Sequence, residues 1–290
     1  NYVRPELLIE KLNSSISASI TVDKLFELAA EIAGGLSSVH YGYSQVATKI
    51  AVSSLHRNTH QSLYDVARIL YENRNRKTGA PAPLIATDVY TIIENNAVAL
   101  DSALKFDRDF QLDYFGFKIL EEQYLLRVSD KPVERPQHMF LRVALGIHKE
   151  DLAAAIETYE GLSQRYFTHG SATLRHAGTP RPYLSSCFLS KIPSDSISGI
   201  YDSLRECAVV AQRDGGVGLA VHEIRANGSI INNGSESESK GLVPVLRLFD
   251  QTERFMHLQG RRRSALAVYL EPWHSDVLDV LDMRRAFGRE

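Results

Sequence analysis

Helical spacing dominates the first 180 residues of the chain. One pattern begins after Thr21 or Asp23, whose side chains can cap the free amides of a first helical turn. A longer pattern runs over residues 44–74, and a loop rich in glycine and proline follows at 75–83. Further helices are predicted over residues 86–104, 136–148 and 150–167. The sequence therefore predicts an all-helical N-terminal region.

After about residue 180 the pattern changes to strand, helix and strand. Short apolar runs at residues 184–189, 217–221 and 265–270 are typical of buried strands. Between the first two runs, a helix is predicted to start at Asp195 or Ser196, because either side chain can accept first-turn amide hydrogens. Its apolar positions recur at helical spacing: Ile197, Ile200, Tyr201, Leu204, Ala208 and Ala211. This alternation favours an α/β domain.

A glycine cluster, GGVG at residues 215–218, lies directly before the second apolar run. A dinucleotide-binding fingerprint follows a strand and opens a helix, so the order of elements excludes that interpretation. Cys187 lies inside the first apolar run. A strand with a thiol, a capped helix and a glycine turn where a ligand could approach the backbone together form a candidate site.

The composition is that of an ordinary globular protein, with 44% hydrophobic and 23% charged residues among 290. A net charge of −2 gives no electrostatic footprint for nucleic acid. No apolar stretch approaches the roughly 20 residues that span a bilayer, and the charged start of the chain does not resemble a secretory signal. Two distant cysteines in apolar surroundings indicate a reducing compartment, so we expect a cytoplasmic protein that binds neither nucleic acid nor membrane.

Two other groups of residues have both a functional and a structural interpretation. His56 and His60 lie one helical turn apart and could face a metal, but no third ligand is suitably spaced and a solvated helix face is favoured. The aromatic segment 107–117, with Phe110, Tyr114, Phe115 and Phe117, could stack on a nucleotide. Aromatic residues serve cores more often, which favours a packed loop that anchors two helices.

Several long blocks occur in the order found in one known family. They include FDRDFQLDYFGFKILEEQYLL, HAGTPRPYLSSC, DSISGIYDSL, GGVGLAV, GLVPVLRLFD and YLEPWH. With them the chain resembles the large, catalytic subunit of class I ribonucleotide reductase, most closely the eukaryotic type. The resemblance implies an all-helical N-terminal region followed by the first elements of the ten-stranded reductase α/β barrel. It also implies three parts: ATP-cone-like helices without their hairpin at 1–60, a helical domain at 61–180 and the start of the barrel at 181–290.

The resemblance assigns roles at the candidate site. Cys187 matches the family's first redox cysteine, which gives reducing equivalents to the substrate and forms a disulfide with a distant partner; a cysteine in an apolar strand is otherwise more often an inert thiol. Cys207 has no matching role and is interpreted as a core residue. The positions that bind the nucleoside diphosphate substrate are Ser171, Ser186, Gly215 and Gly216.

The start of the helix after Cys187 matches the site of the specificity effector, ATP or a deoxynucleoside triphosphate. Arg225 matches an arginine that grips the effector phosphates, which suits its forked, permanent charge. For Asp195 a plain helix cap is the alternative role, and both can hold together. The remaining effector-binding positions are Ser196, Ile197, Asn233, Gly234 and Ser235. In the family this helix also packs against its copy in a second subunit, which implies a homodimer.

The resemblance also implies partners and redox components. A small subunit supplies a metal-generated radical, and thioredoxin or glutaredoxin acts as the external reductant. The large subunit binds no cofactor directly, and no metal site is expected in this chain. The family's radical cysteine and later barrel strands would follow residue 290, so the 290-residue chain alone is expected to lack reductase activity.

Some positions depart from the family. The loop after Arg225 is about one residue longer and carries Glu236 and Glu238, whose charge would weaken triphosphate binding. The second specificity loop, residues 259–265, lacks a glycine and the proline, and Phe26 replaces an aspartate that contacts nucleotide. The first hypothesis is the N-terminal portion of a reductase large subunit. The alternatives are a truncated, non-catalytic paralogue that binds nucleotide or the intact large subunit, and an unrelated cysteine-nucleophile enzyme, for which no histidine is placed as general base.

Overall fold

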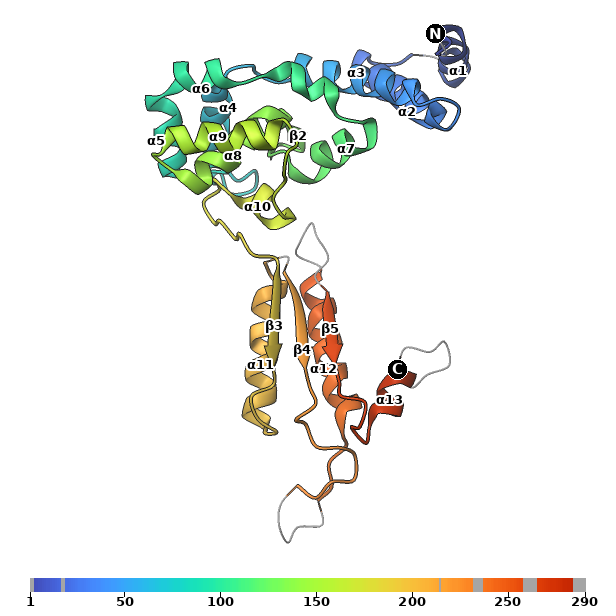
Figure 1. Cartoon of the computed structure of the whole chain (residues 1–290), viewed down its shortest axis with the longest axis vertical. Helices are drawn as coiled ribbons and strands as arrows, with labels where there is room; N and C mark the ends of the chain where they lie inside the picture. The colour runs from blue at the N-terminus through green and yellow to red at the C-terminus, as the bar shows by residue number, and fades with distance from the viewer. Residues whose placement is uncertain (1–2, 17–18, 214, 232–236, 258–264, 284–290) are drawn as a thin grey trace. The chain divides into compact units, whose positions relative to one another are not determined.

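A computed structural model describes residues 3–16, 19–213, 215–231, 237–257 and 265–283 (Figure 1). The chain forms two compact units, Asn1–Leu184 and Ser185–Glu290. The division lies close to the change of pattern expected after residue 180. Each unit has its own hydrophobic core, and each is described by itself.

The first unit is helical apart from one short antiparallel pair of strands, β1 (Arg127–Val128) and β2 (Lys131–Pro132). Thr21 caps α2 by accepting a hydrogen bond from the Lys24 amide at 3.3 Å, so Asp23 is not the cap. The α-helices of this unit are α1 (Pro5–Ser15), α2 (Val22–Gly35), α3 (Gly42–Arg57), α4 (Leu63–Tyr71), α5 (Thr87–Asn95), α6 (Ala97–Ala103), α7 (Tyr114–Ile119), α8 (Pro136–His148), α9 (Leu152–Ser163) and α10 (Ser171–His176). Shorter helical turns are η1 (Leu36–Ser38), η2 (Phe106–Gln111) and η3 (Leu120–Tyr124).

The long helix predicted over residues 44–74 is wrong, because the chain breaks between α3 and α4. Arg135, at the start of α8, satisfies the backbone carbonyls that the break releases. Its guanidinium donates to the carbonyls of His56 at 3.0 Å and Thr59 at 2.8 Å, and to the Thr59 hydroxyl at 3.0 Å. Ser62 then caps α4. The break depends on a residue 79 positions from His56, which local spacing does not show.

Helix α8 forms the centre of the first core, with every residue from Pro136 to Gly146 buried. A fully buried ion pair joins it to the preceding segment, since Arg142 donates to Glu134 at 2.6 Å and each side chain is only 1% exposed. Arg142 also donates to the carbonyl of Ala177 at 2.6 Å. The pair therefore ties α8 to the end of α10, and its remaining donors are used.

The second unit has a three-stranded parallel sheet in the order β3 (Cys187–Lys191), β4 (Gly216–Ala220) and β5 (Leu266–Tyr269). Helices α11 (Ile197–Ala211) and α12 (Leu242–His257) connect the strands and pack against each other, and α13 (Val277–Asp282) follows β5 (Figure 1). The three strands were predicted, although β3 starts three residues later than expected. Strand–helix crossovers between parallel neighbours are the pattern of an α/β domain.

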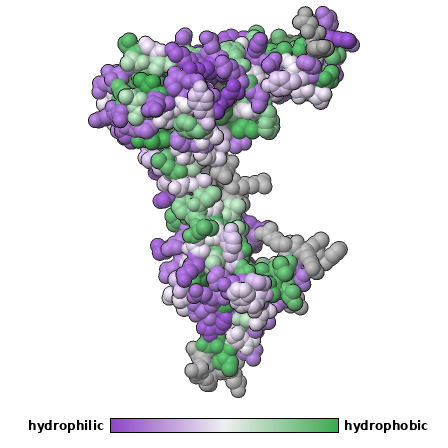
Figure 2. Space-filling model, in the orientation of Figure 1, coloured by the Kyte–Doolittle hydropathy of each residue, from purple (hydrophilic) through white to green (hydrophobic). Residues whose placement is uncertain are grey.

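The two faces of this sheet differ. Val217 and Leu219 of β4 are buried in the second core with Leu246 and Phe249 of α12. The expectation of a buried first strand is wrong, because Cys187, Phe188 and Leu189 of β3 are exposed. This edge strand and β5 contribute exposed hydrophobic residues to the surface seen in Figure 2. In the described part of the chain, no helix covers the face that carries Leu189 and Tyr269.

Candidate functional site

Cys187 begins β3 and is paired in register with Gly216, the first residue of β4. The amide of Gly216 donates to the Ser186 carbonyl at 2.7 Å, and the Ser186 hydroxyl lies 3.6 Å from the Cys187 sulfur. Three residues predicted for the site therefore lie together at the amino ends of two adjacent strands. The Cys187 thiol is free and exposed, so it is open to a reaction partner from solvent.

The two glycines before β4 have different surroundings. A Cβ on Gly215 would lie 2.6 Å from Val210 Cγ1, so this buried glycine is required by packing against the end of α11. A Cβ on Gly216 would meet nothing closer than the Ala265 carbonyl at 3.5 Å. Gly216 thus leaves its backbone open beside Cys187, while Gly215 is held by the core.

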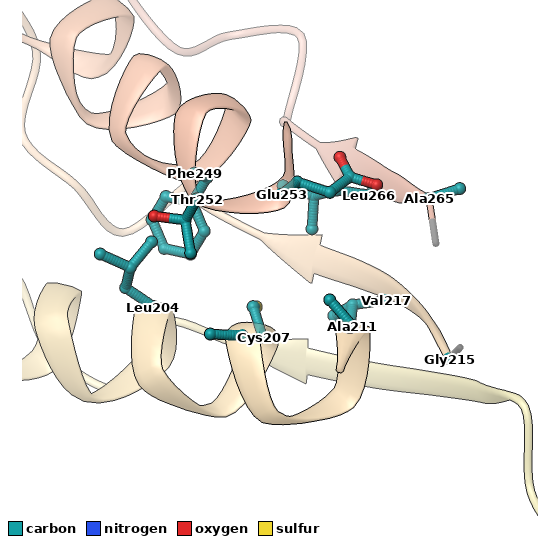
Figure 3. A pocket seen from close by; sticks show the side chains of 11 residues that line it. Leu204, Cys207, Ala211, Gly215, Val217, Phe249, Thr252, Glu253, Ala265 and Leu266 are labelled. Atoms are coloured by element: carbon teal, nitrogen blue, oxygen red, sulfur yellow. The ribbon is translucent and has the colours of Figure 1, made fainter. Parts of the chain in front are cut away.

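Cys207 is partly buried and packs against the second core, as expected from the inner face of its helix. It projects from α11 towards α12 and β4, among Leu204, Val217 and Phe249 (Figure 3). Burial raises the pKa of its thiol to about 11. A thiol with such a pKa carries almost no thiolate at neutral pH, so Cys207 is chemically inert by comparison with an exposed cysteine.

At the start of α11, the two polar candidates divide their roles. The Ser196 hydroxyl caps the helix by accepting from the Gly199 amide at 3.1 Å. The Asp195 carboxylate instead accepts from Arg225 Nε at 2.5 Å, across 30 positions of sequence. The cap expected at Asp195 or Ser196 is Ser196, which leaves Asp195 free to bind Arg225. Ile197, the next residue, is exposed.

Arg225 also organises the loop that follows it. Its Nη1 donates to the carbonyls of Ile230 at 3.2 Å and Ile231 at 3.0 Å, and its Nη2 donates to the Asp195 carbonyl at 3.3 Å. The two arms of the loop pair between Ile231 and Ser237. In the Asp195–Arg225 ion pair the arginine side chain is 30% exposed and the aspartate side chain 27% exposed, so solvent and ligands reach it.

Several residues of the predicted effector site lie outside the described residues. These are Asn233, Gly234, Ser235 and Glu236, together with positions 259–264 of the second specificity loop. Glu238 is described: it is exposed and forms an antiparallel bridge with Ile230. Glu238 therefore lies opposite Ile230, whose carbonyl accepts a hydrogen bond from Arg225.

Ser171, the other predicted substrate residue, lies in the first unit at the beginning of α10. Its hydroxyl accepts from the Tyr124 hydroxyl at 3.2 Å, and the side chain is half-buried. Two residues further, Thr173 Oγ1 donates to the Leu184 carbonyl at 3.1 Å, which holds α10 against the segment leading to Ser185. Tyr124 was not predicted, and its contact joins residues 47 positions apart.

The solvated helix face expected for His56 is wrong. His56 Nε2 lies 2.8 Å from Asp109 Oδ2, and Gln137 Nε2 donates to the other oxygen of this fully buried carboxylate at 2.9 Å. Burial raises the pKa of Asp109, and the contacts with His56 and Gln137 oppose that shift. His60 is exposed beyond the end of α3. Among the described residues, no group of three or more His, Cys, Asp or Glu could hold a metal ion.

The aromatic segment 107–117 mostly packs, as favoured above. Phe117 is fully buried and Phe110 packs against the first core, where its ring meets that of His56 edge-on. Phe115 is the exception and is exposed. These surroundings leave little of the segment for nucleotide stacking.

Phe26 lies under a cation. The Arg57 guanidinium is 4.5 Å from the centre of the Phe26 ring and also pairs with Asp23. Asn58 donates to the same Asp23 carboxylate at 3.1 Å, and this bond, with Arg57, lowers the Asp23 pKa. The negative charge of Asp23 beside Phe26 is therefore neutralised by contacts within the protein.

No helix among the described residues is long and apolar enough to cross a membrane.

Comparison with known proteins gives two family matches, in the order of the two units. Residues 110–182 match the ribonucleotide reductase all-alpha domain, and residues 185–290 match the ribonucleotide reductase barrel domain. These matches confirm the expected fold class, a helical region followed by the start of an α/β barrel.

Individual relatives are similar along the whole chain. The ribonucleoside-diphosphate reductase large subunit of Arabidopsis thaliana is 50% identical over 287 residues, which cover 99% of this chain and 35% of the relative. The large chain of Schizosaccharomyces pombe is 47% identical over 291 residues, covering 100% and 36%. The large subunit of Danio rerio is 45% identical, also covering 100% and 36%. The chain thus spans about a third of the length of these relatives.

Proposed function

The chain belongs to the ribonucleotide reductase large-subunit family, and from this membership we propose that it forms part of an enzyme that reduces ribonucleoside diphosphates to deoxyribonucleotides. The observation that carries the proposal is that the exposed Cys187 lies beside Gly216, whose backbone has no side chain to shield it from a ligand. Cys187, Ser186 and Gly216 meet at the amino ends of β3 and β4, in the unit that matches the family's barrel domain.

In the proposed reaction, Cys187 is one of two thiols that together donate two electrons and become a disulfide. The second thiol is not Cys207, because that side chain lies in the core between the sheet and the helices, with a raised pKa. We assign it to a cysteine of the complete protein outside residues 1–290. Thioredoxin or glutaredoxin would then reduce the disulfide, and a small subunit would supply the radical that starts the reaction.

The substrate would lie against the amino ends of β3 and β4. The Ser186 hydroxyl would bind the substrate, with the Gly216 backbone close to the sugar, and Ser171 is proposed as a further substrate-binding residue on the family resemblance alone. Gly215 acts in this proposal by fixing the turn rather than by touching the ligand, since it is buried against Val210. The lack of a Cβ at Gly216 is the feature that lets a sugar approach the strand.

A thiol-protection experiment tests this substrate site. We expect saturating CDP to slow alkylation of Cys187 by iodoacetamide several-fold, because bound nucleotide covers the thiol, and to leave the slow alkylation of Cys207 unchanged. Mass spectrometry of both cysteine peptides measures the two rates in one sample, with Cys207 as internal control. Ser186→Ala should reduce the protection. Equal Cys187 rates with and without CDP would contradict the proposal.

The effector site is proposed at the start of α11 and the loop after Arg225. Asp195 would accept from a sugar hydroxyl or base, and Arg225 would bind the phosphates of ATP or a deoxynucleoside triphosphate. Phosphate oxygens would replace the Ile230 and Ile231 carbonyls as acceptors of Arg225 Nη1. Ser196 and Ile197 at the helix start, with Asn233, Gly234 and Ser235 in the loop, complete the proposed site.

Titration with fluorescent dTTP tests the effector site. Arg225→Ala should weaken binding by about 1.5–3 kcal/mol, the scale of a hydrogen bond to a charged group. Binding to the wild type should weaken with added salt, because it involves ionic contacts. Arg254→Ala, which removes an exposed arginine from α12, is the matched control. Glu236→Gln with Glu238→Gln should strengthen binding, and equal affinity in all variants would place the site elsewhere.

We further propose a homodimer through α11 and a cytoplasmic location, with no binding to nucleic acid or membrane. The support for the dimer is an apolar stripe on the outer side of α11, where Ile197 is 74% and Tyr201 is 52% exposed. Both residues were predicted as part of one apolar face with Ile200 and Leu204, but the core of the second unit is contacted by Ile200 and Leu204 and not by the exposed pair. The exposed pair is thus available to a second copy.

A further inference from the structure

Asp276 lies at a position where an aspartate usually has a local role. It is the N-cap residue of α13, and such a carboxylate ordinarily accepts from the first amides of its own helix. Asp276 makes no such bond. Its carboxylate turns away from α13, is only 4% exposed, and binds backbone groups far away in sequence. A buried carboxylate used in this way serves the elements that it contacts.

Those contacts are with the two ends of one loop. The Asn227 amide donates to Asp276 Oδ1 at 3.0 Å and lies 3.2 Å from Oδ2, two residues after Arg225. The Leu242 amide, the first of α12, donates to Asp276 Oδ2 at 2.9 Å. One carboxylate therefore holds both the beginning and the end of the loop proposed to bind effector. Negative charge at the α12 N-terminus is also favourable for the helix dipole.

His274 adds a third point of attachment from the same turn. Its Nε2 donates to the Ile224 carbonyl at 2.8 Å, which leaves Nδ1 to accept from the Asp276 amide at 3.1 Å. The backbone is thereby held at Ile224 and Asn227, on both sides of Arg225. Gly241 fits this arrangement: its φ is +74°, and a Cβ there would lie 2.3 Å from Asp276 Oδ2.

We propose that Asp276, supported by His274, is a positioning residue of the effector site. By fixing the backbone before and after Arg225, it sets the direction from which the guanidinium meets Asp195 and the incoming phosphates. This inference rests on the proposed effector site. It adds to that site a residue that touches no ligand and acts through Arg225.

The test uses the 290-residue chain with Asp276→Asn, Gly241→Ala and the control Asp279→Asn, which changes an exposed aspartate on α13. An asparagine keeps one acceptor oxygen, places an N–H where the other oxygen was and carries no charge, so both amides lose a charged acceptor. Gly241→Ala disturbs the same contact from the opposite side. We expect Asp276→Asn and Gly241→Ala to bind fluorescent dTTP about tenfold more weakly than the wild type does. This change matches the loss of one charge-assisted hydrogen bond. The control should bind as the wild type does.

Two further readouts separate positioning from general loss of structure. Amide exchange at Asn227 and Leu242 should become at least about tenfold faster in Asp276→Asn, since both amides lose their charged acceptor. Exchange in β4 should stay unchanged. In an Arg225→Ala background, Asp276→Asn should have little further effect on dTTP affinity, because its action passes through Arg225.

The outcomes distinguish the inference from the effector proposal itself. A wild-type chain that binds no dTTP would overturn the effector site and the positioning role together. If the wild type binds dTTP, unchanged affinity in both Asp276→Asn and Gly241→Ala would overturn the positioning role alone. Additive losses in the Arg225→Ala background, or faster exchange throughout β4, would show that Asp276 only stabilises the fold.

Discussion

At the scale of single residues, His138 shows how burial fixes a protonation state. This histidine of α8 is fully buried, and its Nε2 donates to the Gln61 carbonyl at 3.0 Å. Its Nδ1 accepts from the Arg135 amide at 3.2 Å. Both ring nitrogens are used by the neutral form, so a second proton would break a hydrogen bond. Burial accordingly lowers the pKa of His138 to about 3.

The consequence is a stability that declines in mild acid. An unfolded histidine has a pKa of about 6.5, so below that pH the unfolded chain binds a proton that the folded chain does not. The stabilising contribution is complete above about pH 6.5 and is lost as the pH falls, by up to about 1.4 kcal/mol per pH unit. We expect His138→Gln, which can keep both hydrogen bonds, to reduce this pH dependence of the unfolding free energy.

Urea unfolding of wild type and His138→Gln at several pH values between about 4.5 and 6.5 measures the effect. The exposed His60 supplies the control, because His60→Gln should leave the pH dependence unchanged. Parallel stability curves for wild type and His138→Gln would show that another group takes up the proton.

At the scale of elements, sequence patterns predict what local spacing controls. The strand with Cys187, the helix capped by Ser196 and the strand after the glycine cluster were predicted close to their observed positions. Two parallel strands joined by a helix begin at the same edge of a sheet, and Cys187 and Gly216 lie together at that edge. The family resemblance, rather than spacing, supplied the expectation that Asp195 and Arg225 share a site, and the two side chains are in contact.

Features that depend on distant contacts were missed. The break between α3 and α4 is sealed by Arg135, and the loop after Arg225 is closed by Asp276. Neither residue has a local pattern that indicates its partner, because the contacts join positions 76 and 34 residues apart. An aspartate directly before an apolar helix is usually interpreted as a helix cap. The sequence around Asp276 therefore does not indicate its contacts with the loop after Arg225.

Arg135 provides a test of the element scale. We expect Arg135→Met to lower the unfolding free energy by about 2–3 kcal/mol, because the carbonyls of His56 and Thr59 lose their donors inside the protein. Methionine keeps apolar contact with Phe106, over whose ring the guanidinium lies at 4.8 Å. Urea unfolding measures the loss. Arg68→Met, at an exposed site on α4, should change stability by no more than about 0.5 kcal/mol.

At the scale of the whole molecule, the apolar surface of the second unit indicates that this sheet packs against another part of the protein or a partner. Leu189 of β3 is 86% exposed, and Tyr269 of β5, on the same face of the sheet, is 55% exposed. Large apolar side chains gathered on one face of a sheet generally meet another part of the protein. The family match to a barrel domain, of which the chain covers the beginning, explains why β3 and β5 lack further neighbours among the described residues.

The exposed stripe of α11 has a different expected partner, a second copy of the same helix. Tyr201→Asp would place a charge in the centre of that contact, where it would be desolvated without a partner. We therefore expect sedimentation velocity to show a concentration-dependent dimer for the wild type and a monomer for Tyr201→Asp. Tyr166→Asp, at an exposed tyrosine of the helical unit, is the matched control and should still dimerise.

The dimer and the effector site should be linked, because Asp195 precedes the first turn of the same helix by two residues. If pairing of α11 steadies that turn, dilution of the wild type to monomer should weaken dTTP binding by mass action. Tyr201→Asp should then bind dTTP weakly at every protein concentration. An affinity for dTTP that is the same for monomer and dimer would separate the two sites, since a ligand with equal affinity for both states cannot shift the balance between them.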